Sequence, residues 1–502
     1  MSETRIVTRF PPEPNGYLHL GHLKAMLFDF DLHAGEGGTC ILRMDDTNPK
    51  TEKQEYVDAI VEDVKWMGFR FSRLTYTSDY FDALYDCAVR LVRMGCAYVD
   101  LTPADEIRRM RHDGIESEFR SRGAEWHLTE FARMKTGEYA ENEAVLRLKI
   151  NMQDDNHSLR DPIAYRVMDC AHYRTGTKYR AFPTYDFSHG IVDALEGITH
   201  SYCTTEFLVR RPQYLWPVEK LGLTPATVVE FGRLNVEGVE LSKRKIIPLV
   251  ADGTLSGFDD PRLYTLRGLR RRGFTPEILR SIVAPSTMAR HETCLSRGWI
   301  EHELRTVLER DSPRAFAVMD PLPVVITNFG VGSGRECPHP NHPTAKDKGS
   351  HVTHLTERIW IERADFREVD SADYYRLAPH KVVRLRFSDF VRCDGYDDGS
   401  LTVSLCTPEK PKKVKGVIHW VGTGDASVPT TFEVYGDGVA GTVSRFAGYV
   451  ERFVAEELER APGTIFQFER LGYFKLDRRD PDGRPVFLRV IDLVDHYTKP
   501  VQ

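Results

Sequence analysis

The chain has 502 residues, too many for a single hydrophobic core, so we expect several domains. Hydrophobic residues make up 41% and charged residues 28%, which is typical of globular proteins and excludes a disordered or fibrous chain. The formal net charge of -6 gives no bulk basicity, so a nucleic-acid partner would have to be met by a local basic surface.

The cysteines and the N-terminus predict a reducing, cytoplasmic location. Nine cysteines are scattered along the chain without a C-x-x-C pair, which is typical of free thiols. The first ten residues contain neither an apolar signal core nor an arginine-rich amphipathic stretch. No uninterrupted apolar run is long enough to span a bilayer.

The first hundred residues alternate between strand-like and helix-like periods. The β-prone runs are 6–10, 40–44 and 97–99, and the runs with helical spacing are 20–32, 56–67 and 81–94. Strands that alternate with helices predict a parallel sheet covered on both faces. We therefore expect residues 1–100 to form the first half of a Rossmann-like α/β domain.

Composition divides the rest of the chain. Residues 101–181 are interpreted as an insertion, because 102–142 are polar, charged and helix-like before strand-like sequence returns. A second α/β segment is predicted over 182–245, with a helical subdomain over 246–315. Short β-prone runs separated by Gly, Pro, Asn and Asp predict two all-β barrels over 316–502. We expect 316–350 and 459–502 in the proximal barrel, and 351–458, including a helix-like stretch at 447–458, in the distal barrel.

The most informative stretch is RFPPEPNGYLHLGH, residues 9–22. His19 and His22 are three apart where the pattern predicts that a strand runs into a helix, so both share a face of its first turn. Backbone N–H groups at a helix start can hold a phosphate, and imidazoles can donate hydrogen bonds to charge that develops on phosphorus. Gly21 lets a nucleotide approach closely, and Asn15-Gly16 fits a turn shaped around a ligand. For an isolated H-x-G-H string, two ordinary surface histidines would be the better interpretation.

A second cluster, LSKRK, spans residues 241–245. Lys243 can offer a point charge to phosphates, most usefully as pyrophosphate departs. A basic run this short usually forms a solvated turn. The function of Lys243 therefore depends on the fold bringing it to the same triphosphate as the two histidines.

Together these stretches resemble the ATP-binding motifs of class I aminoacyl-tRNA synthetases, and EPNGYLH resembles their glutaminyl and glutamyl branch. The resemblance implies catalytic roles for His19, His22 and Lys243. The residues it implies for ATP binding are Glu13, Pro14, Asn15, His19, Leu20, Gly21, His22, Leu23, Lys24, Ala25, Thr204, Arg233, Leu234, Leu241, Ser242 and Lys243. One departure is Glu240, which stands where the motif's first lysine is expected.

Further segments extend the resemblance over nearly the full length. They are RMDDTNP, YTSDYFD, YRTGTKY, PTYDFSHGIVDALEGITHS, DDPRLYTLRGLRRRGF, SPRAFAVMD, KKVKGVIHW and FQFERLGYF. Ser188-His189 and the CTTEF stretch at 203–207 favour the glutaminyl over the glutamyl group. By the same resemblance Asp45 binds the α-ammonium of the amino acid, Tyr185 contacts the side-chain amide, and Arg9 lies beside the substrate. Taken alone, Asp45 could be a solvated strand end and Tyr185 a core aromatic.

The resemblance also implies the partners. It places an acceptor-stem-binding domain in the insertion and anticodon-binding barrels at the C-terminus. Two basic runs could contact tRNA phosphates. They are Arg267, Arg270, Arg271 and Arg272, and Lys410, Lys412, Lys413 and Lys415. Residues 434–458 are shorter than the usual barrel sequence, which leaves the anticodon contacts open.

Zinc is a weaker alternative. Cys337, His339, His342, His351 and His354 lie close in sequence, and zinc accepts Cys and His. Their spacing does not fit a zinc finger, and PNHP resembles a family loop without metal. We therefore expect no tightly bound protein metal.

The sequence predicts an ATP-dependent ligase that charges tRNA(Gln) with L-glutamine, with Mg2+ bridging the phosphates. By family resemblance, tRNA binds before glutamine is activated. We expect a monomer, and association with other synthetases stays open. The alternatives are a glutamyl ligase of the archaeal and eukaryotic type and a non-catalytic tRNA-binding protein derived from a synthetase. The presence of His19, His22, Lys243, Asp45 and Tyr185 argues against the second alternative.

Overall fold

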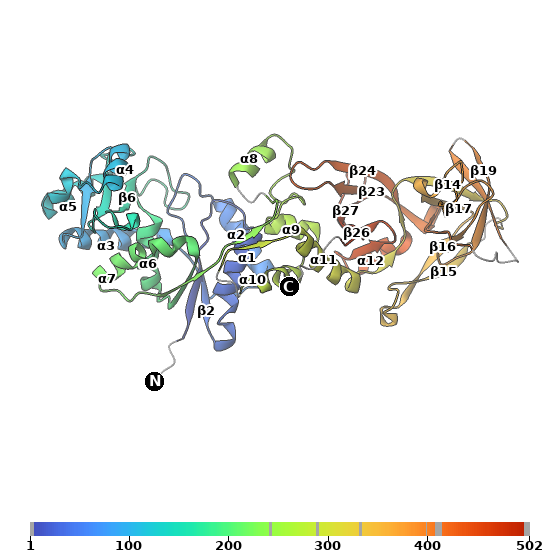
Figure 1. Ribbon diagram of the computed structural model, residues 1–502, viewed down its shortest axis with the longest axis horizontal. Coiled ribbons are helices and arrows are strands. Elements are labelled where there is room, and N and C mark those ends of the chain that lie inside the picture. The colour runs from blue at the N-terminus through green and yellow to red at the C-terminus, as the bar shows by residue number, and fades with distance from the viewer. Residues whose placement is uncertain are drawn as a thin grey trace. The chain divides into compact units, whose positions relative to one another are not determined.

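The computed structural model describes residues 5–239, 243–287, 291–330, 334–397, 399–406 and 414–495, without the side chain of residue 243. Two compact units are present, and Figure 1 labels their elements. Unit 1 consists of Met1–Glu237, Thr265–Arg267 and Leu279–Leu295. Unit 2 consists of Gly238–Tyr264, Gly268–Ile278 and Ser296–Gln502.

A parallel sheet lies at the centre of unit 1 and confirms the predicted α/β class. Its first three strands run parallel in the order β1-β2-β3, and β8 pairs in parallel with β9. Strand β8 lies beside β1, because the backbone N–H of Thr199 donates to the carbonyl oxygen of Val7 over 2.9 Å. The strands are β1 (Val7–Phe10), β2 (Thr39–Met44), β3 (Leu74–Tyr76), β8 (His200–Thr204) and β9 (Thr227–Phe231). The helices are α1 (Leu20–Met26), α2 (Gln54–Trp66), α3 (Phe81–Arg93), α6 (Tyr185–Glu196) and α7 (Arg211–Lys220).

The predicted helix at 20–32 is only partly regular. Helix α1 ends at Met26, and residues Leu27–Asp31 continue as a π-helical turn. The backbone stays helical through this turn. The predicted helix is therefore present, but its hydrogen-bond pattern changes after Met26. A π-helical turn contains one residue more than an α-helical turn, and such turns are frequent at functional sites.

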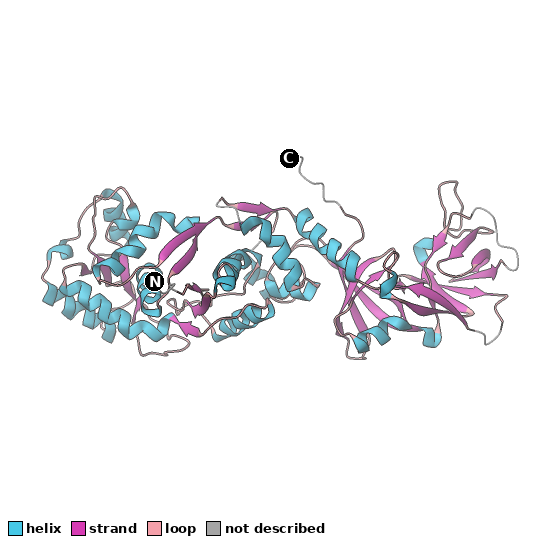
Figure 2. Ribbon diagram, turned by 90° about the horizontal axis from the view of Figure 1, so that it is seen from below, coloured by secondary structure: helices cyan, strands magenta, loops and turns pink. Residues whose placement is uncertain are grey.

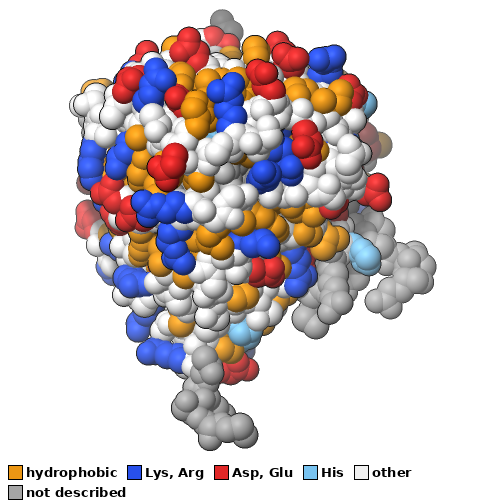
Figure 3. Space-filling view, turned by 90° about the vertical axis from the view of Figure 1, so that its left-hand side faces the viewer, with side chains coloured by type: hydrophobic (Ala, Val, Ile, Leu, Met, Phe, Trp, Pro, Cys, Tyr) orange, Lys and Arg blue, Asp and Glu red, His pale blue; other side chains and the backbone are white. Residues whose placement is uncertain are grey.

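The insertion is built on an antiparallel sheet in the order β4-β5-β6-β7, so the strand expected at 97–99 pairs antiparallel with β5 and does not join the parallel sheet. Its elements are β4 (Ala97–Asp100), α4 (Ala104–Asp113), α5 (Ala124–Thr136), β5 (Val145–Leu148), β6 (Ile163–Val167) and β7 (Ala181–Pro183). The insertion shares its core with the parallel-sheet part, because Phe131, Leu146 and Ile191 belong to one buried cluster. Figure 3 views the end that carries α5, where acidic and basic side chains are interspersed over the described surface.

The described residues between 243 and 311 form four helices and one short strand. The helices are α8 (Lys243–Ala251), α9 (Leu266–Arg272), α10 (Pro276–Thr287) and α11 (Arg297–Asp311). The short strand β11 (Thr293–Leu295) interrupts this region and pairs in parallel with β10 (Leu234–Val236) in unit 1. Among the described helices, none has the length and apolarity that a membrane span requires.

After α11, unit 2 is dominated by the strands that Figure 2 shows in magenta. Two seven-stranded sheets have the orders β12-β25-β26-β27-β23-β24-β13 and β21-β18-β19-β20-β14-β17-β22. The first contains β12 (Arg314–Ala315), β13 (Ala317–Val318), β23 (Ser427–Tyr435), β24 (Val443–Glu451), β25 (Ile465–Phe468), β26 (Gly472–Arg479) and β27 (Pro485–Ile491). The second contains β14 (Pro321–Ile326), β17 (Arg358–Glu362), β18 (Val382–Leu385), β19 (Phe390–Asp397), β20 (Ser400–Leu405), β21 (Val417–Ile418) and β22 (Val421–Gly422). A separate hairpin pairs β15 (Arg335–Pro340) with β16 (Ser350–Leu355).

The strand pairing differs from the predicted division of the barrels at 350 and 458. Strand β14 pairs with β17 and β20, although it was expected in the proximal barrel. Strands β23 and β24 belong with β27, although they were expected in the distal barrel. Residues 447–451 are strand rather than helix, and helix α12 (Arg452–Arg460) begins after them. These differences arise from long-range parallel pairing, which local sequence patterns do not encode.

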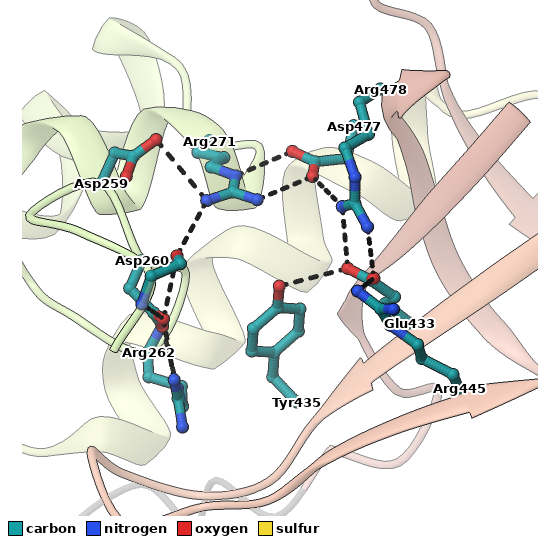
Figure 4. Close-up of polar contacts among 10 residues, drawn as sticks. Asp259, Asp260, Arg262, Arg271, Glu433, Tyr435, Arg445, Asp477 and Arg478 are labelled. Atoms are coloured by element: carbon teal, nitrogen blue, oxygen red, sulfur yellow. Dashed lines mark hydrogen bonds and ion pairs between the residues drawn. The ribbon is translucent and has the colours of Figure 1, made fainter. Parts of the chain in front are cut away.

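A chain of ion pairs joins the unit 2 end of α9 to this β-rich part (Figure 4). Arg271 donates two hydrogen bonds to Asp477 on β26, over 2.9 Å and 2.8 Å. Arg478 donates to the same Asp477 over 2.9 Å and holds Glu433 on β23 through bonds of 3.0 Å and 2.6 Å. Tyr435 also donates to Glu433, over 3.2 Å. Paired, partly buried charges of this kind fix the orientation of packed elements.

Candidate active site

His19 and His22 form a reciprocal cap at the start of α1. The backbone N–H of Gly21 donates to Nδ1 of His19 over 3.1 Å, and the backbone N–H of His19 donates to Nδ1 of His22 over 3.1 Å. The two ring centroids lie 3.9 Å apart. Because both Nδ1 atoms accept, a neutral ring must carry its proton on Nε2. Each ring therefore offers one Nε2–H donor in a fixed orientation.

Both imidazoles are neutral at physiological pH. Burial, together with the neighbouring His22 and Arg233, holds the pKa of His19 well below its usual value. Burial and Arg233 lower the pKa of His22 to about 4. A neutral imidazole can donate a hydrogen bond without being required to exchange a proton. The pair is therefore suited to stabilising developing negative charge.

Gly21 is needed because a side chain at this position would collide with His19 and Leu234. A Cβ atom at this position would lie 2.9 Å from Cε1 of His19 and 3.1 Å from the carbonyl oxygen of Leu234. The second contact is with backbone and cannot be relieved by a side-chain rotation. Glycine therefore allows the His19 ring and β10 to pack against α1.

The other predicted ATP-binding residues of the first motif surround this cap with different exposures. Glu13 is exposed, Asn15 is half-buried, and the backbone N–H of Asn15 donates to the carbonyl oxygen of Glu13 over 2.8 Å. Pro14, Leu20, Leu23 and Lys24 are buried, and Ala25 is half-buried. Leu20 and Leu23 are core residues, so only their backbone can contact a nucleotide.

Three predicted residues come from distant segments. Leu234 begins β10 and packs against Gly21, as described above. Arg233 influences both histidines electrostatically and donates to Glu206 over 2.6 Å. Thr204 ends β8, the strand beside β1. The fold therefore brings Arg233 and Leu234 to the first motif across more than two hundred positions.

The lysine-rich cluster is only partly described. Glu240, Leu241 and Ser242 lie outside the described residues, and Lys243 begins α8 without a described side chain. The convergence of Lys243 on His19 and His22 therefore remains a prediction.

Arg9 is held by protein groups on every side. Its guanidinium donates to Asp193 over 3.1 Å, to Ser201 over 2.6 Å and to the carbonyl oxygen of Tyr202 over 3.2 Å. Its Nη2 also lies 2.7 Å from Nε2 of His189. Burial opposes the charge on Arg9, but Asp193, with smaller effects from Tyr214, Asp29 and Tyr185, outweighs burial and raises the pKa of the guanidinium. The guanidinium of Arg9 is therefore engaged by protein groups.

Arg43 completes this buried ion-pair network. It donates to Asp193 and, over 2.9 Å, to Glu196. Burial alone would raise the pKa of Asp193, but Arg9 and Arg43 hold it below its usual range. Sequence patterns did not identify Arg43, Asp193 or Glu196 as site residues, because each is an ordinary charged residue until the sheet brings the three together.

Asp45 and Tyr185 interact at the end of the sheet. Burial raises the pKa of Asp45 to about 7, against the opposing effect of Arg43. Burial also raises the pKa of Tyr185 above its usual value, Arg9 opposes that rise, and the Asp45 carboxylate adds to it. The backbone N–H of Asp45 donates to the carbonyl oxygen of Pro12 over 3.0 Å, which ties Asp45 to the first motif.

Tyr185 also lines a small cavity with Arg9. The Tyr185 ring stacks on His189, with 4.6 Å between the centroids, and Phe207 lies 5.6 Å away. The cavity has a volume of about 30 Å³, and Cys203 completes this part of its wall. That volume admits about one water molecule, so an amino acid could not enter without side-chain movement.

In the first of the predicted tRNA-binding basic runs, three of the four arginines contact protein groups. Arg267 pairs with Glu62, Arg271 with Asp477, and Arg272 donates to the carbonyl oxygen of Val490 over 3.2 Å. In that run Arg270 is exposed. In the second run, Lys410, Lys412 and Lys413 lie outside the described residues, and Nζ of the exposed Lys415 lies 5.1 Å from the Tyr375 ring centroid.

We predict that Gly21→Ala displaces His19 and destabilises the protein by about 1–3 kcal/mol, since the new methyl group meets backbone. Thermal unfolding measures the loss, and 15N NMR of the imidazoles reports whether Nδ1 of His19 still accepts a hydrogen bond. Gly35→Ala is the matched control, because a Cβ there meets nothing within 4 Å. Equal behaviour of the two variants would contradict the packing described for Gly21.

This chain resembles known proteins in sequence over most of its length. Residues 5–304 match the family described as "tRNA synthetases class I (E and Q), catalytic domain", and residues 312–409 match its anti-codon binding domain. A solved glutamate tRNA ligase from Elizabethkingia meningosepticum gives a TM-score of 0.46 at 18% identity, covering 62% of this chain and 70% of that chain. That likeness is too weak to add support.

Curated relatives align over almost the whole chain. A protein named "Glutamine--tRNA ligase" from Vibrio cholerae is 40% identical over 99% of this chain and 95% of its own length. A protein of the same name from Nitrosomonas europaea gives the same identity and coverage. The chain therefore belongs to the class I tRNA synthetases of the E and Q type.

Proposed function

We propose that this chain is a glutamine–tRNA ligase. The observation that carries this conclusion is its 40% identity, over 99% of its length, to relatives named for that activity. The neutral imidazole pair at the start of α1 and the acidic Asp45 beside Tyr185 supply groups that suit the chemistry.

The reaction proceeds in two transfers. The α-carboxylate of glutamine attacks the α-phosphorus of ATP, a new oxygen–phosphorus bond forms, and pyrophosphate leaves. A ribose hydroxyl of the terminal adenosine of tRNA then attacks the acyl carbon, and AMP leaves. The first transfer builds negative charge on the oxygens around phosphorus, and the Nε2–H groups of His19 and His22 are proposed to donate to it.

Lys243 and Mg2+ are proposed to balance the remaining phosphate charge. Among the described residues, the one group of three or more potential metal ligands lies in unit 2, away from the first motif in sequence. A triphosphate can itself supply most of the oxygen ligands that Mg2+ prefers. The ion would therefore arrive with ATP, and Lys243 would stabilise the departing pyrophosphate.

For the amino acid, Asp45 is proposed to bind the α-ammonium group, and Tyr185 to read the side-chain amide. Arg9 holds His189 and Asp193 behind the site rather than offering a free fork of donors. We propose, from the family resemblance, that tRNA binds before glutamine is activated. We further propose tRNA(Gln) as the partner, a monomeric enzyme and a cytoplasmic location.

We expect the purified protein to charge tRNA with glutamine and not with glutamate. Aminoacylation of total tRNA with each amino acid in turn measures this directly. Preference for glutamate would replace the proposal with a glutamyl ligase, and inactivity with both amino acids alongside intact ATP binding would support a non-catalytic tRNA-binding protein.

The variant His22→Ala should slow adenylate formation about 100- to 1,000-fold, because one hydrogen-bond donor to the transition state is lost. ATP–pyrophosphate exchange in the presence of tRNA measures that step. His112→Ala is the matched control, because His112 is exposed on α4. Equal rates for both variants would exclude a role for His22 in charge stabilisation.

Glutamine binding should strengthen as the pH rises through 7. With a pKa of about 7, the ionised fraction of Asp45 increases about eightfold between pH 6 and pH 7.5, and only the carboxylate attracts the α-ammonium group. The KM for glutamine should fall about eightfold over that range. In Asp45→Asn the KM should be high and independent of pH, whereas the exposed control Asp58→Asn should behave as the parent. A pH dependence that survives in Asp45→Asn would assign the titration to another group.

A further inference from the structure

We propose that unit 2 contains a binding site for a divalent transition-metal ion of the zinc class, formed by His339, His351 and Glu451. One ligand atom from each of these residues lies within 4.8 Å of the other two. His339 and Glu451 are buried, and the side chain of His351 is only 6% exposed. The proposed site is independent of the ligase chemistry.

The backbone register places the two imidazoles side by side. His339 on β15 stands directly opposite His351 on β16 in the antiparallel hairpin. Directly opposite residues project to the same face of a hairpin, and these two rings lie 4.4 Å apart between centroids. Glu451 is the last residue of β24, and its Oε1 lies 3.2 Å from Nε2 of His351 and 3.7 Å from Nδ1 of His339.

Neighbouring groups contact the nitrogens of both rings, and Nδ1 of His339 lies 3.4 Å from Oγ1 of Thr353. Nδ1 of His351 lies 2.6 Å from Oδ1 of Asn341. An amide oxygen can only accept, so Nδ1 carries a proton, and Nε2 is the nitrogen that faces the Glu451 carboxylate, where an ion would replace the Nε2 proton. On the other ring, Nε2 of His339 makes no hydrogen bond to any described residue, and its nearest carboxylate is Glu469 at 3.5 Å. A carboxylate behind a histidine is the usual outer partner of a metal-bound imidazole.

Hydrogen bonds from Phe316 and Thr353 hold the Glu451 carboxylate in place. The backbone N–H of Phe316 donates to Oε1 of Glu451 over 2.6 Å, and the hydroxyl of Thr353 donates to Oε2 over 2.6 Å. Each carboxylate oxygen accepts about two hydrogen bonds, and the second partner of Oε1 is Nε2 of His351 at 3.2 Å, so an ion would take the place of that contact. Hydrogen bonding of this kind orients ligating carboxylates.

The donor set selects the class of ion. Two imidazoles and one carboxylate suit zinc and related divalent transition metals better than Mg2+ or Ca2+, which prefer oxygen ligands. Zinc lies about 2.0–2.2 Å from each such ligand atom, so two ligand atoms of one ion are at most about 4.4 Å apart. The 3.2 Å and 3.7 Å separations meet this limit, and the ligand atoms of the two imidazoles lie within 4.8 Å of each other.

The proposed ion would tie the β15–β16 hairpin to the sheet that contains β24. An isolated two-stranded hairpin is marginally stable, and an ion that binds only the folded site stabilises it. His351 and Glu451 are 100 residues apart in the chain, so the spacing of the cysteine and histidines at 337–354 does not indicate this ligand set.

The test uses the full-length protein, stripped with a chelator and then titrated with Zn2+. We expect one Zn2+ per chain to remain through gel filtration, measured by elemental analysis, and the melting temperature to rise on loading. Glu451→Gln and His351→Gln should each weaken Zn2+ binding about 100-fold in competition with a chromogenic chelator. His354→Gln is the matched control, because His354 lies on the same strand outside the proposed ligand set.

X-ray absorption of the zinc-loaded parent protein provides a readout that does not depend on variants. The proposal predicts a first shell of nitrogen and oxygen that includes two imidazoles. A sulfur ligand, loss of zinc from the parent on gel filtration, or equal affinity in the ligand and control variants would each overturn it. The three residues would then form a buried hydrogen-bonded cluster only.

Discussion

The ion-pair network of Arg9, Arg43, Asp193 and Glu196 is the constraint on which the proposed amino-acid site depends. All four side chains are buried, so their charges are tolerated only because each has a partner. Removing one partner from such a network typically costs about 3–5 kcal/mol, because it leaves an uncompensated charge. The network joins β1, β2 and α6, and α6 carries Tyr185. The position of Tyr185 relative to Asp45 therefore follows from electrostatics in the core of unit 1.

The start of α1 could be predicted from the sequence, whereas its chemistry could not. The turn residues after β1 and the spacing of His19 and His22 correctly indicated two histidines at a helix start. Their neutrality depends on burial and on Arg233, which is more than two hundred residues away. Their tautomer depends on two backbone hydrogen bonds that exist only in the folded cap. Motif spacing therefore located the histidines, and tertiary structure determines what they can do.

The same contrast applies to unit 2. Short β-prone runs correctly predicted an all-β region, but β14 and β23 pair with strands that are distant in sequence, so the predicted limits of the two barrels were misplaced. The arginine run of α9 looked like a phosphate-binding surface, yet Arg271 and Arg272 bind groups of unit 2 itself. A run of basic residues indicates only that negatively charged partners are required. Those partners can be carboxylates of the same chain as well as phosphates.

The central claim is that the neutral imidazoles of His19 and His22 and the ammonium group of Lys243 act on one triphosphate. A crystal structure of the full-length protein with a non-hydrolysable ATP analogue tests this most directly. We expect Nε2 of His19 and His22 and Nζ of Lys243 to lie within hydrogen-bonding distance of phosphate oxygens, about 2.7–3.2 Å. A triphosphate held elsewhere, with the imidazoles and Lys243 in separate surroundings, would contradict the account.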